Sequence, residues 1–400
     1  MSKKYLSELM KDKELKGNTL IISPTGSGKT HYIVNELCKN KKVLYLCDNS
    51  NLEEQVSLED NTRVIKNNQI KKGFNRTDIQ IMTYKAFGMK VKYDIDDDYI
   101  NSFKLIICDE IHNLVDYQTF NNDADLSHVI ISLMKEYDNT QILMFTATPY
   151  YLDELAKKHE GVDKYYSRID FSKDRQIMRY INKREAYLNH ISQIQFALEE
   201  YRQSFEYSNM KCLIYVDKID DMKFIEDMCI DRKLKPICIW SKNNSKHYMN
   251  DEQMKVREYL LSTGELLSPY NVLIINRATE TGVNIYDEKM QLAIVNTTNI
   301  TQQIQARGRI RHDVDLLVIK TNDKNKIDTI TIKDELLGKW LLKIDLENMI
   351  KDFKLRDEKR REMTVNKFIN LLTNNNYRIS KSRKLINENK ITLYKIIKTR

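Results

Sequence analysis

The stretch Ser23-Pro24-Thr25-Gly26-Ser27-Gly28-Lys29-Thr30 determines which fold we expect for this chain. It follows the apolar run Asn18–Ile22 and precedes a helix-like segment from His31 to Lys39. A strand, a glycine-rich turn ending in Gly-Lys-Thr and a helix, in this order, are typical of a loop that holds nucleotide phosphates. The alternative is a flexible turn with these letters by chance, but strand and helix both fall where a phosphate loop requires them.

Each residue of this loop has an expected role. Gly26 and Gly28 let backbone N–H groups converge on phosphate oxygens, and the N-terminus of the following helix adds a favourable field. Lys29 would reach the β- and γ-phosphates, and the Thr30 hydroxyl would lie on Mg²⁺. We therefore expect a site for ATP or GTP with Mg²⁺, formed by Thr25, Gly26, Ser27, Gly28, Lys29 and Thr30.

The composition predicts an ordered globular protein of two or three domains, because 41% of the 400 residues are hydrophobic and only four are prolines. No apolar run approaches the roughly 20 residues of a membrane span, and the first residues lack the apolar core of a signal peptide. The six cysteines lie far apart, which favours buried thiols over a zinc site or disulfides. We expect a cytoplasmic protein, in a bacterial or other host cell, without a membrane partner.

The positive charge of the chain is concentrated at its C-terminal end. From Arg361 to Arg400 there are ten basic and two acidic residues, an excess of +8 that equals the net charge of the whole chain. A coding bias toward Lys and Asn would also produce basic residues, but it would not concentrate them in one region. The C-terminal region is therefore the predicted footprint for nucleic acid.

Short apolar runs alternate with amphipathic segments over most of the chain. Runs such as Leu105–Cys108 are apolar throughout, which is typical of strands buried on both faces of a parallel sheet. The strand candidates are Lys42–Cys47, Asp78–Thr83, Lys104–Asp109 and Thr140–Thr146, and then Lys211–Val216, Pro236–Trp240, Asn271–Asn276, Met290–Val295 and Asp315–Lys320. We expect an α/β fold of two tandem parallel-sheet domains, residues 1–170 and 171–322, and a small basic accessory region, residues 323–400, that is mostly helical.

Asp109-Glu110-Ile111-His112 follows the buried run Leu105–Cys108. A carboxylate at the end of a strand beside a phosphate loop holds the Mg²⁺ of a nucleotide hydrolase, which predicts this role for Asp109. Glu110 would orient and activate the attacking water. His112 would link this site to the next motif, or it is a polar residue without a special role.

Thr146-Ala147-Thr148-Pro149 closes another buried strand. The hydroxyls of Thr146 and Thr148 could hydrogen-bond the Asp-Glu pair and couple its state to a neighbouring surface. The alternative is a strand-to-helix turn with Pro149 in the first helical turn.

The second set of strands brings two further motifs. Thr281-Gly282-Val283-Asn284 comes after one buried strand, and Gln305-Ala306-Arg307-Gly308-Arg309-Ile310-Arg311 lies on a predicted helix. Arginines on a neighbouring domain can stabilise charge on a transferring γ-phosphate, a contribution of roughly 10³–10⁵ in rate. Binding to a phosphate backbone is the alternative for the same cluster.

Taken together, these motifs resemble, in order and spacing, motifs I, II, III, V and VI of the superfamily 2 helicases, a DEAD/DEAH-like group. The resemblance covers roughly residues 15 to 322 and implies two RecA-like domains with ATP between them and nucleic acid crossing both. It implies that Gln305 and Arg309 face ATP, that Gly282 and Asn284 contact the nucleotide, and that Thr83 and Thr281 contact nucleic acid.

The chain departs from the family pattern at two places. The last arginine of motif VI, Arg311, commonly stands one residue later, where this chain has His312, so that either Arg311 or Arg307 is the second arginine finger. The leader Met1–Leu20 has no clear glutamine motif for adenine. The short form resembles the helicases of phages and viruses.

The basic C-terminal end has a helix candidate, Val365–Leu372, and a strand candidate, Ile391–Ile397. Between them lies the predicted phosphate-binding set Lys381, Arg383 and Lys384. A winged-helix-like module could hold phosphates with these residues and stack Tyr377 or Tyr394 on bases. A helical extension with solvated lysines is the alternative.

These patterns predict an ATP-dependent helicase or translocase that acts on DNA in preference to RNA, in replication, recombination or repair of a phage or virus-like element. An RNA helicase and a non-unwinding, ATP-gated initiator that binds a particular sequence are the alternatives. The resemblance implies movement from 3′ to 5′. Protein partners and oligomeric state are not predicted.

Overall fold

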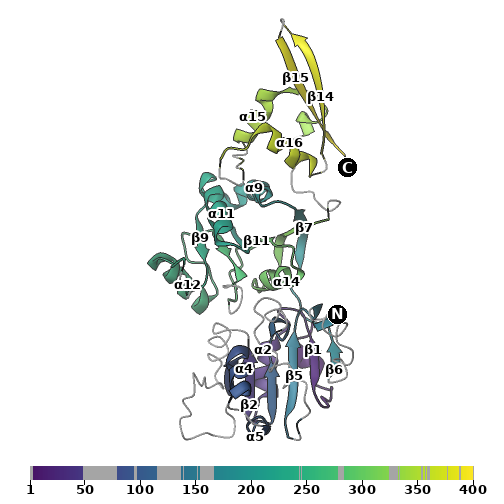
Figure 1. Cartoon of the computed structure of the whole chain (residues 1–400), viewed down its shortest axis with the longest axis vertical. Coiled ribbons are helices and arrows are strands. Elements are labelled where there is room, and N and C mark those ends of the chain that lie inside the picture. Colours follow the sequence, from purple (N-terminus) through teal and green to yellow (C-terminus); the bar gives the residue numbers. More distant parts are fainter. Residues whose placement is uncertain are drawn as a thin grey trace. The chain divides into compact units, whose positions relative to one another are not determined.

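The computed structural model describes residues 3–47, 79–93, 97–114, 139–150, 152–153, 166–242, 246–277, 283–323, 334–352, 361–375, 377–386 and 389–399, with single residues 137, 244, 332, 355 and 357. The chain divides into two compact units, Met1–Tyr180 and Ile181–Arg400. Figure 1 shows the course of the chain through both. The predicted functional boundaries after residues 170 and 322 stay a prediction.

The first unit is built on a parallel sheet of six strands in the order β3-β2-β4-β5-β1-β6. The strands are β1 (Thr19–Ile22), β2 (Val43–Cys47), β3 (Ile79–Thr83), β4 (Leu105–Cys108), β5 (Gln141–Thr146) and β6 (Ser167–Asp170). All side chains of β1, β2 and β4 are buried, as expected for strands covered on both faces. The helical segments are α1 (Leu6–Met10), α2 (Lys29–Tyr32), the π-helix Ile33–Leu37, α4 (Tyr84–Tyr93) and α5 (Asp97–Asn101).

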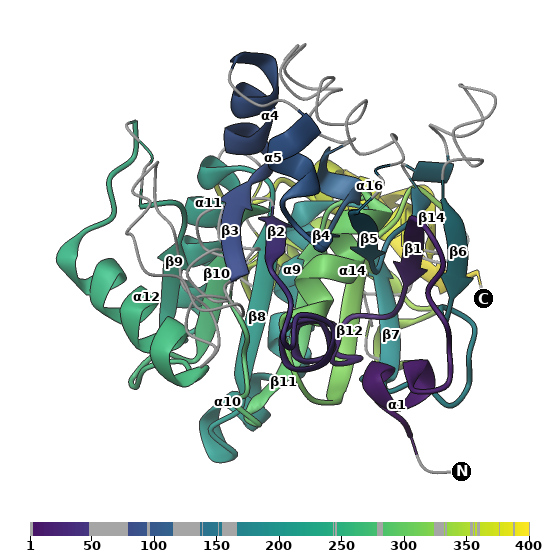
Figure 2. The same ribbon diagram turned by 90° about the horizontal axis from the view of Figure 1, so that it is seen from below.

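The second unit contains another parallel sheet of six strands, in the order β7-β12-β11-β8-β10-β9. The strands are β7 (Asn182–Leu188), β8 (Lys211–Val216), β9 (Pro236–Ile239), β10 (Val272–Ile275), β11 (Met290–Asn296) and β12 (Val314–Lys320). Its helices are the 3₁₀ segment Ile191–Gln193, α9 (Ile194–Glu200), α10 (Arg202–Tyr207), α11 (Ile219–Asp231), α12 (Asp251–Thr263) and α14 (Ile300–Gly308). Figure 2 shows α12 beside the edge strand β9.

Side-chain chemistry sets where these helices begin and end. In α12, the Asn250 side chain accepts a hydrogen bond from the Gln253 backbone N–H, and the Gln253 side chain accepts one from the Asn250 N–H. This reciprocal capping satisfies two N–H groups that the helix itself leaves without partners. Asn299 caps α14 by accepting from the Gln302 N–H. This helix, predicted to carry the whole arginine cluster, ends at Gly308, so it carries Arg307, while Arg309 and Arg311 follow it.

The predicted pair of parallel-sheet domains is confirmed, but the sequence analysis missed the edge strands β6 and β7. The sequence from Tyr150 to about Phe205 has long charged stretches of helical pattern and only weak strand signals. Leu188 is the one buried side chain in these two strands, so they lack the apolar runs that identify the buried strands.

The C-terminal region combines helices with a three-stranded antiparallel sheet in the order β13-β15-β14. Its elements are the 3₁₀ segment Asp334–Leu336, β13 (Trp340–Leu342), α15 (Lys343–Asp352), α16 (Val365–Thr373), β14 (Tyr377–Ile386) and β15 (Asn389–Lys398). One short strand, two helices and a long β-ribbon are compatible with the winged-helix-like arrangement. The strands are longer than expected for a mostly helical region.

Candidate active site

The phosphate loop connects β1 to α2, and its two glycines adopt a backbone conformation that other residues rarely reach. Gly26 and Gly28 have φ angles of 78° and 83°, in the left-handed region that strongly favours glycine. A Cβ atom at Gly26 would also collide with the Tyr180 ring, and one at Gly28 would lie 3.2 Å from the Tyr5 ring. The backbone conformation therefore favours glycine at both positions, and a side chain at Gly26 would also have to displace the Tyr180 ring.

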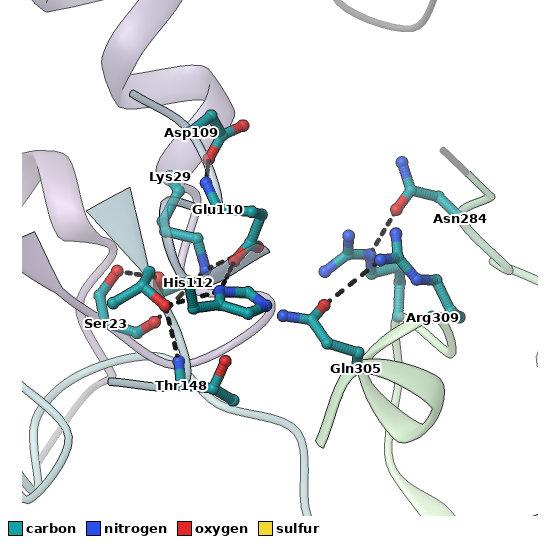
Figure 3. A network of polar contacts seen from close by, with 12 residues as sticks. Ser23, Lys29, Asp109, Glu110, His112, Thr148, Asn284, Gln305 and Arg309 are labelled. Carbon is teal, nitrogen blue, oxygen red and sulfur yellow. Dashed lines mark hydrogen bonds and ion pairs between the residues drawn. The ribbon is translucent and has the colours of Figure 1, made fainter. Parts of the chain in front are cut away.

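Lys29, the first residue of α2, is only 9% exposed. Its Nζ donates to the Ser23 carbonyl oxygen at 3.3 Å and lies 3.8 Å from Glu110 Oε1. In Figure 3, the lysine side chain points toward this carboxylate. The structure thus brings together the predicted phosphate-binding cation and the predicted catalytic carboxylate.

Asp109 lies immediately after β4 and is buried. Tyr45 donates its hydroxyl to Asp109 Oδ2 at 2.6 Å, and the Glu110 backbone N–H donates to Oδ1 at 3.0 Å. Burial raises the pKa of Asp109 from 3.8 to about 6, and repulsion from Glu110 adds to the rise, while the Tyr45 hydrogen bond and Lys29 oppose it. Because its ionised form is destabilised by burial, the Asp109 carboxylate would be stabilised by a nearby cation.

Glu110 has a φ angle of 49°, which is unusual for a residue with a side chain. Backbone strain of this kind costs about 1–3 kcal/mol and persists where the surrounding structure enforces it. Here the flanking N–H groups are fixed, because Asp109 N–H donates to the Leu46 carbonyl of β2 and Ile111 N–H donates to the Phe145 carbonyl of β5. The two neighbouring strands therefore aim the Glu110 side chain.

A row of polar contacts continues from Glu110 to the end of β5. His112 is fully buried; its Nδ1 lies 3.3 Å from Glu110 Oε2 and 2.9 Å from the Thr146 hydroxyl. Thr146 accepts a hydrogen bond from the Thr148 backbone N–H at 2.9 Å. Thr148 Oγ is buried and has no hydrogen-bond partner within the described part of the chain. The predicted coupling residues therefore form one connected network with the carboxylate (Figure 3).

In the second unit, the predicted residues of motifs V and VI also meet in pairs. The isolated bridge between Ile285 and Ile310 joins the two segments. Beside it, Arg311 Nε donates to Asn284 Oδ1 at 2.7 Å. Arg309 Nη2 donates to Gln305 Oε1 at 3.3 Å, and both of these side chains are buried.

Arg307 has a different environment from its two neighbours. Its guanidinium donates to the Asn182 side chain and to the backbone carbonyls of Ile181, Ile310 and His312. These contacts tie α14 to the start of β7. Because these contacts engage the guanidinium of Arg307 within the protein, they favour Arg311 as the second finger.

The remaining predicted site residues are dispersed. Thr83 ends β3 and its hydroxyl accepts from the Ala86 N–H, so it caps α4. Lys381, Arg383 and Lys384 are exposed on β14. Thr281 and Gly282 lie outside the described residues. The structure also contradicts base stacking by Tyr377 or Tyr394, because these side chains are only 2% and 8% exposed.

Sequence analysis assigned no role to the tyrosines around the phosphate loop. The bridge between Lys4 and Ile177 holds Tyr5 beside Gly28, and Tyr180 contacts Gly26. Tyr5 is 51% exposed. No local motif marks either residue, because only the folded chain brings them to the loop. For Tyr45, a hydroxyl in a buried strand was a usable signal, since a buried hydroxyl needs a partner.

The oxygen donors of this site suit a magnesium ion. Mg²⁺ prefers carboxylate and hydroxyl oxygens and usually keeps several waters, so Asp109 and Thr30 could hold it with few protein ligands. No group of three or more His, Cys, Asp or Glu side chains able to hold a metal occurs among the described residues. No helix of the described chain is long and apolar enough to cross a membrane.

Residues 1–151 match the family model of the type III restriction enzyme res subunit, ResIII. No curated protein matches the sequence. Among solved structures, Mss116p bound to single-stranded RNA and AMP-PNP is similar, with a TM-score of 0.52 at 14% identity over 80% of this chain and 69% of that chain.

Two further structures extend the similarity. The S. cerevisiae Dbp5 complex with RNA and ADP BeF3 gives a TM-score of 0.52 at 13% identity, over 78% of this chain and 81% of that chain. The Escherichia coli DEAH/RHA helicase HrpB gives 0.53 at 14% identity, over 90% of this chain and 48% of that chain. The ResIII match over residues 1–151 and these structures show that the chain shares the fold of paired RecA-like domains found in these helicases.

Proposed function

We propose that this chain is an ATP-driven motor that moves along single-stranded nucleic acid. The observation that carries the proposal is the connected network Lys29–Glu110–His112–Thr146–Thr148, which joins the phosphate loop to the end of β5. A simple kinase-like phosphate site needs the first two residues. The additional buried histidine and threonines suit an enzyme whose hydrolysis step must be coupled to a second event.

In the proposed hydrolysis step, Thr30 and Asp109 would hold Mg²⁺, which would neutralise developing phosphate charge. Lys29 exchanges its contact with Glu110 for the phosphates. Glu110 is then available to orient the attacking water and accept its proton. The strain at Glu110 serves this role, because it fixes the carboxylate before substrate arrives.

The arginine cluster of the second unit is the proposed partner of this site. We assign Arg309 and Arg311 as the cations that stabilise the γ-phosphate, with Gln305 and Asn284 positioning them through the hydrogen bonds described above. Gly282 stays a predicted nucleotide contact and Thr281 a predicted nucleic-acid contact. Domain closure on ATP and reopening after hydrolysis would alternate the grip on the strand.

DNA is the proposed preferred track, together with a role in replication, recombination or repair of a phage or virus-like element. RNA is the second candidate, since solved structures with this fold include Mss116p bound to single-stranded RNA and Dbp5 bound to RNA. The motor chemistry is the same for both tracks. A comparison of how strongly DNA and RNA stimulate ATP hydrolysis distinguishes the two candidates.

The test is ATP hydrolysis by the purified chain, alone and with single-stranded DNA, duplex DNA or single-stranded RNA, using Lys29→Ala as the blank. We expect strong stimulation by a single strand, which disappears in the blank. Greater stimulation by RNA than by DNA would transfer the assignment to an RNA motor. Hydrolysis that no nucleic acid changes would reject the motor and leave an ATPase with another kind of partner.

A further inference from the structure

The C-terminal sheet has two chemically different faces, which follow from its register. Trp340 pairs with Lys395, and Lys395 pairs with Ser380, so these residues share one face. Leu341 pairs with Tyr394, which pairs with Lys381, on the opposite face. Side chains alternate between faces along each strand, and the register therefore sorts every residue of the sheet.

The face that carries Leu341 and Tyr394 is the inner face, because it packs against the helices. Leu341, Tyr394, Ile396 and Tyr377 are buried in one hydrophobic cluster. The same cluster contains Leu346 and Ile350 of α15 and Phe368, Ile369 and Leu372 of α16. Helices cover this side of the sheet, so its tyrosines serve the core.

The opposite face, which we call the outer face, combines exposed apolar and basic side chains. Trp340 is 45% exposed and Leu342 is 39% exposed, whereas Leu341 between them is 7% exposed. The register adds basic residues from both long strands. The outer face is defined by Trp340, Leu342, Arg378, Lys384, Leu393 and Lys395. Figure 1 shows the ribbon β14–β15 together with α15 and α16 in this region.

The charge of this sheet has one sign. β13, β14 and β15 contain seven basic residues (Arg378, Lys381, Arg383, Lys384, Lys390, Lys395 and Lys398) and no acidic residue. None of the seven forms an ion pair with the residues that the structure describes. Uncompensated cations of this density repel one another, and a polyanion relieves that repulsion.

Protection of sheet edges explains only part of this pattern. Lysines on edge strands prevent pairing with other chains, which accounts for basic residues on β14. Lys395, however, lies on β15, the central strand. Its Nζ lies 5.9 Å from the centroid of the Trp340 ring. A lysine of the central strand held beside an exposed tryptophan of the edge strand β13 needs another explanation.

The helix α16 does not offer a comparable surface. Lys367 is its only basic residue, and Lys367 Nζ is paired with Asp357 Oδ2 at 2.8 Å. Among the described residues, the ribbon therefore offers a denser set of basic side chains than α16 does. An exposed aromatic ring beside a lysine is suited to a strand whose bases are unpaired, because a ring can stack on a base only when the base is accessible.

We propose that the outer face of the C-terminal sheet binds a single strand of nucleic acid, stacking a base on Trp340 and contacting phosphates through Arg378, Lys384 and Lys395. This proposal rests on the proposed motor function and names a binding surface outside the motifs of the two RecA-like domains. In this proposal the exposed Trp340 is the residue that stacks on a base, in place of Tyr377 and Tyr394, which are buried in the core.

The test uses the full chain with dye-labelled oligodeoxythymidylate and oligouridylate, and it follows binding by fluorescence anisotropy without ATP. Trp340→Ala should raise Kd at least roughly fivefold, since loss of one stacked base has an effect of this order. Trp340→Phe retains a ring and should restore most of the affinity. Tyr207→Ala removes another exposed aromatic residue, 79% exposed on α10, and should leave Kd unchanged.

The intrinsic fluorescence of tryptophan gives an independent signal. The chain has two tryptophans, and Trp240 is 6% exposed. Stacking of a base on Trp340 should quench the exposed component when an unlabelled strand is added. In Trp340→Phe, binding should persist while this quenching disappears, a combination that a purely structural role for Trp340 does not produce.

The phosphate contacts are tested by salt dependence. Lys395→Ala should lower the slope of log Kd against log salt by about 0.7, the value for one phosphate contact to a single strand. Lys255→Ala removes an exposed lysine from α12 and serves as the matched control. Equal slopes for the two variants would remove Lys395 from the binding surface.

The outcomes separate this proposal from the motor proposal. If single strands stimulate hydrolysis by the wild-type chain but Trp340→Ala and Lys395→Ala bind them normally, the outer face is not the site and the motor stands. If the wild-type chain neither binds strands nor responds to them, both proposals fail. Self-association lost in Trp340→Ala, with normal strand binding, would make the outer face a protein contact instead.

Discussion

The two parallel-sheet units have the same architecture but different connections after their central strands. In the first unit, β1 leads through two left-handed glycines into α2, whose first residue is Lys29. In the second, β8 leads into α11 through Asp217 and Lys218, without a glycine. Asp220 and Asp221 occupy the first turn of α11, where negative charge opposes phosphate binding. The first connection therefore has the glycines of a phosphate loop and a lysine as the first helical residue, and the second has neither.

This difference shows that the parallel sheet alone does not determine whether a unit can bind phosphate. Both sheets bury hydrophobic clusters on their two faces, and both end strands at one edge where ligands can bind. The chemistry comes from the few residues at that edge. The first unit contributes buried carboxylates and a lysine, and the second contributes arginines held by amides.

The largest effect is expected at Glu110. Replacing it with glutamine removes the proposed base while keeping the size of the side chain, so kcat for ATP hydrolysis should fall by about 10²- to 10⁴-fold. Binding of a fluorescent ATP analogue should persist. Glu258→Gln on the exposed surface of α12 is the control. Retention of more than roughly a tenth of the wild-type kcat would exclude Glu110 as the base.

The next comparison lies within the arginine cluster itself. Arg311→Ala should lower stimulated hydrolysis by roughly 10³-fold, as for other arginine fingers, with little change in thermal unfolding. Arg307→Ala should do the reverse and lower the unfolding midpoint. It removes the hydrogen bonds of the guanidinium to Asn182 and to three backbone carbonyls, of which Ile181 keeps the Val314 N–H as a second donor. Lost hydrogen bonds to a charged group cost about 1.5–3 kcal/mol each.

Both variants are measured by steady-state hydrolysis and by calorimetry on the same preparations. A stable but inactive Arg307→Ala protein would exchange the two assignments. Such a result would mean that the contacts of Arg307 with β7 are dispensable and that its guanidinium acts on the nucleotide.

Local motifs and long-range contacts differ in how far the sequence could predict them. Ser23–Thr30 and Asp109–His112 are contiguous, and their spacing reports the strand-turn-helix context directly. The roles of Tyr180 and Arg307 depend on contacts that only the folded chain makes.

The C-terminal sheet shows the same limit most clearly. Composition predicted a basic region, but the face on which each residue lies depends on pairing register. A shift by one residue would bury Trp340 and expose Leu341. The sequence therefore predicted a nucleic-acid surface in this region, but the tyrosines predicted to stack on bases, Tyr377 and Tyr394, belong to the core.

A smaller effect, on the pH dependence of stability, is expected from substitution of Asp109 when a chelator keeps metal ions away. Its pKa is raised by burial to about 6, so folding is favoured while the carboxyl is protonated, and that contribution is lost as pH rises from about 4 through 6. Asp109→Asn carries no charge at any pH. In the presence of a chelator, the variant should become more stable relative to wild type as pH rises, by about 2–3 kcal/mol at most.

Denaturant unfolding at several pH values between about 4 and 8 checks this expectation. A stability difference that is constant across this range would mean that Asp109 does not change its protonation there. The variant should be inactive in hydrolysis, since it also loses the proposed metal ligand. Stability and activity would then change in opposite directions at one residue.

The smallest effect is expected at the acidic helix start that distinguishes the second unit. Asp220 is exposed in the first turn of α11, where a negative charge stabilises a helix by about 0.3–1 kcal/mol. Asp220→Asn should lower stability by this amount and leave stimulated ATP hydrolysis unchanged. Chemical unfolding at low salt measures the first quantity, and high salt should abolish the difference by screening. A change in hydrolysis instead would show that this connection acts on the nucleotide. The assignment of phosphate binding to the first unit alone would then be wrong.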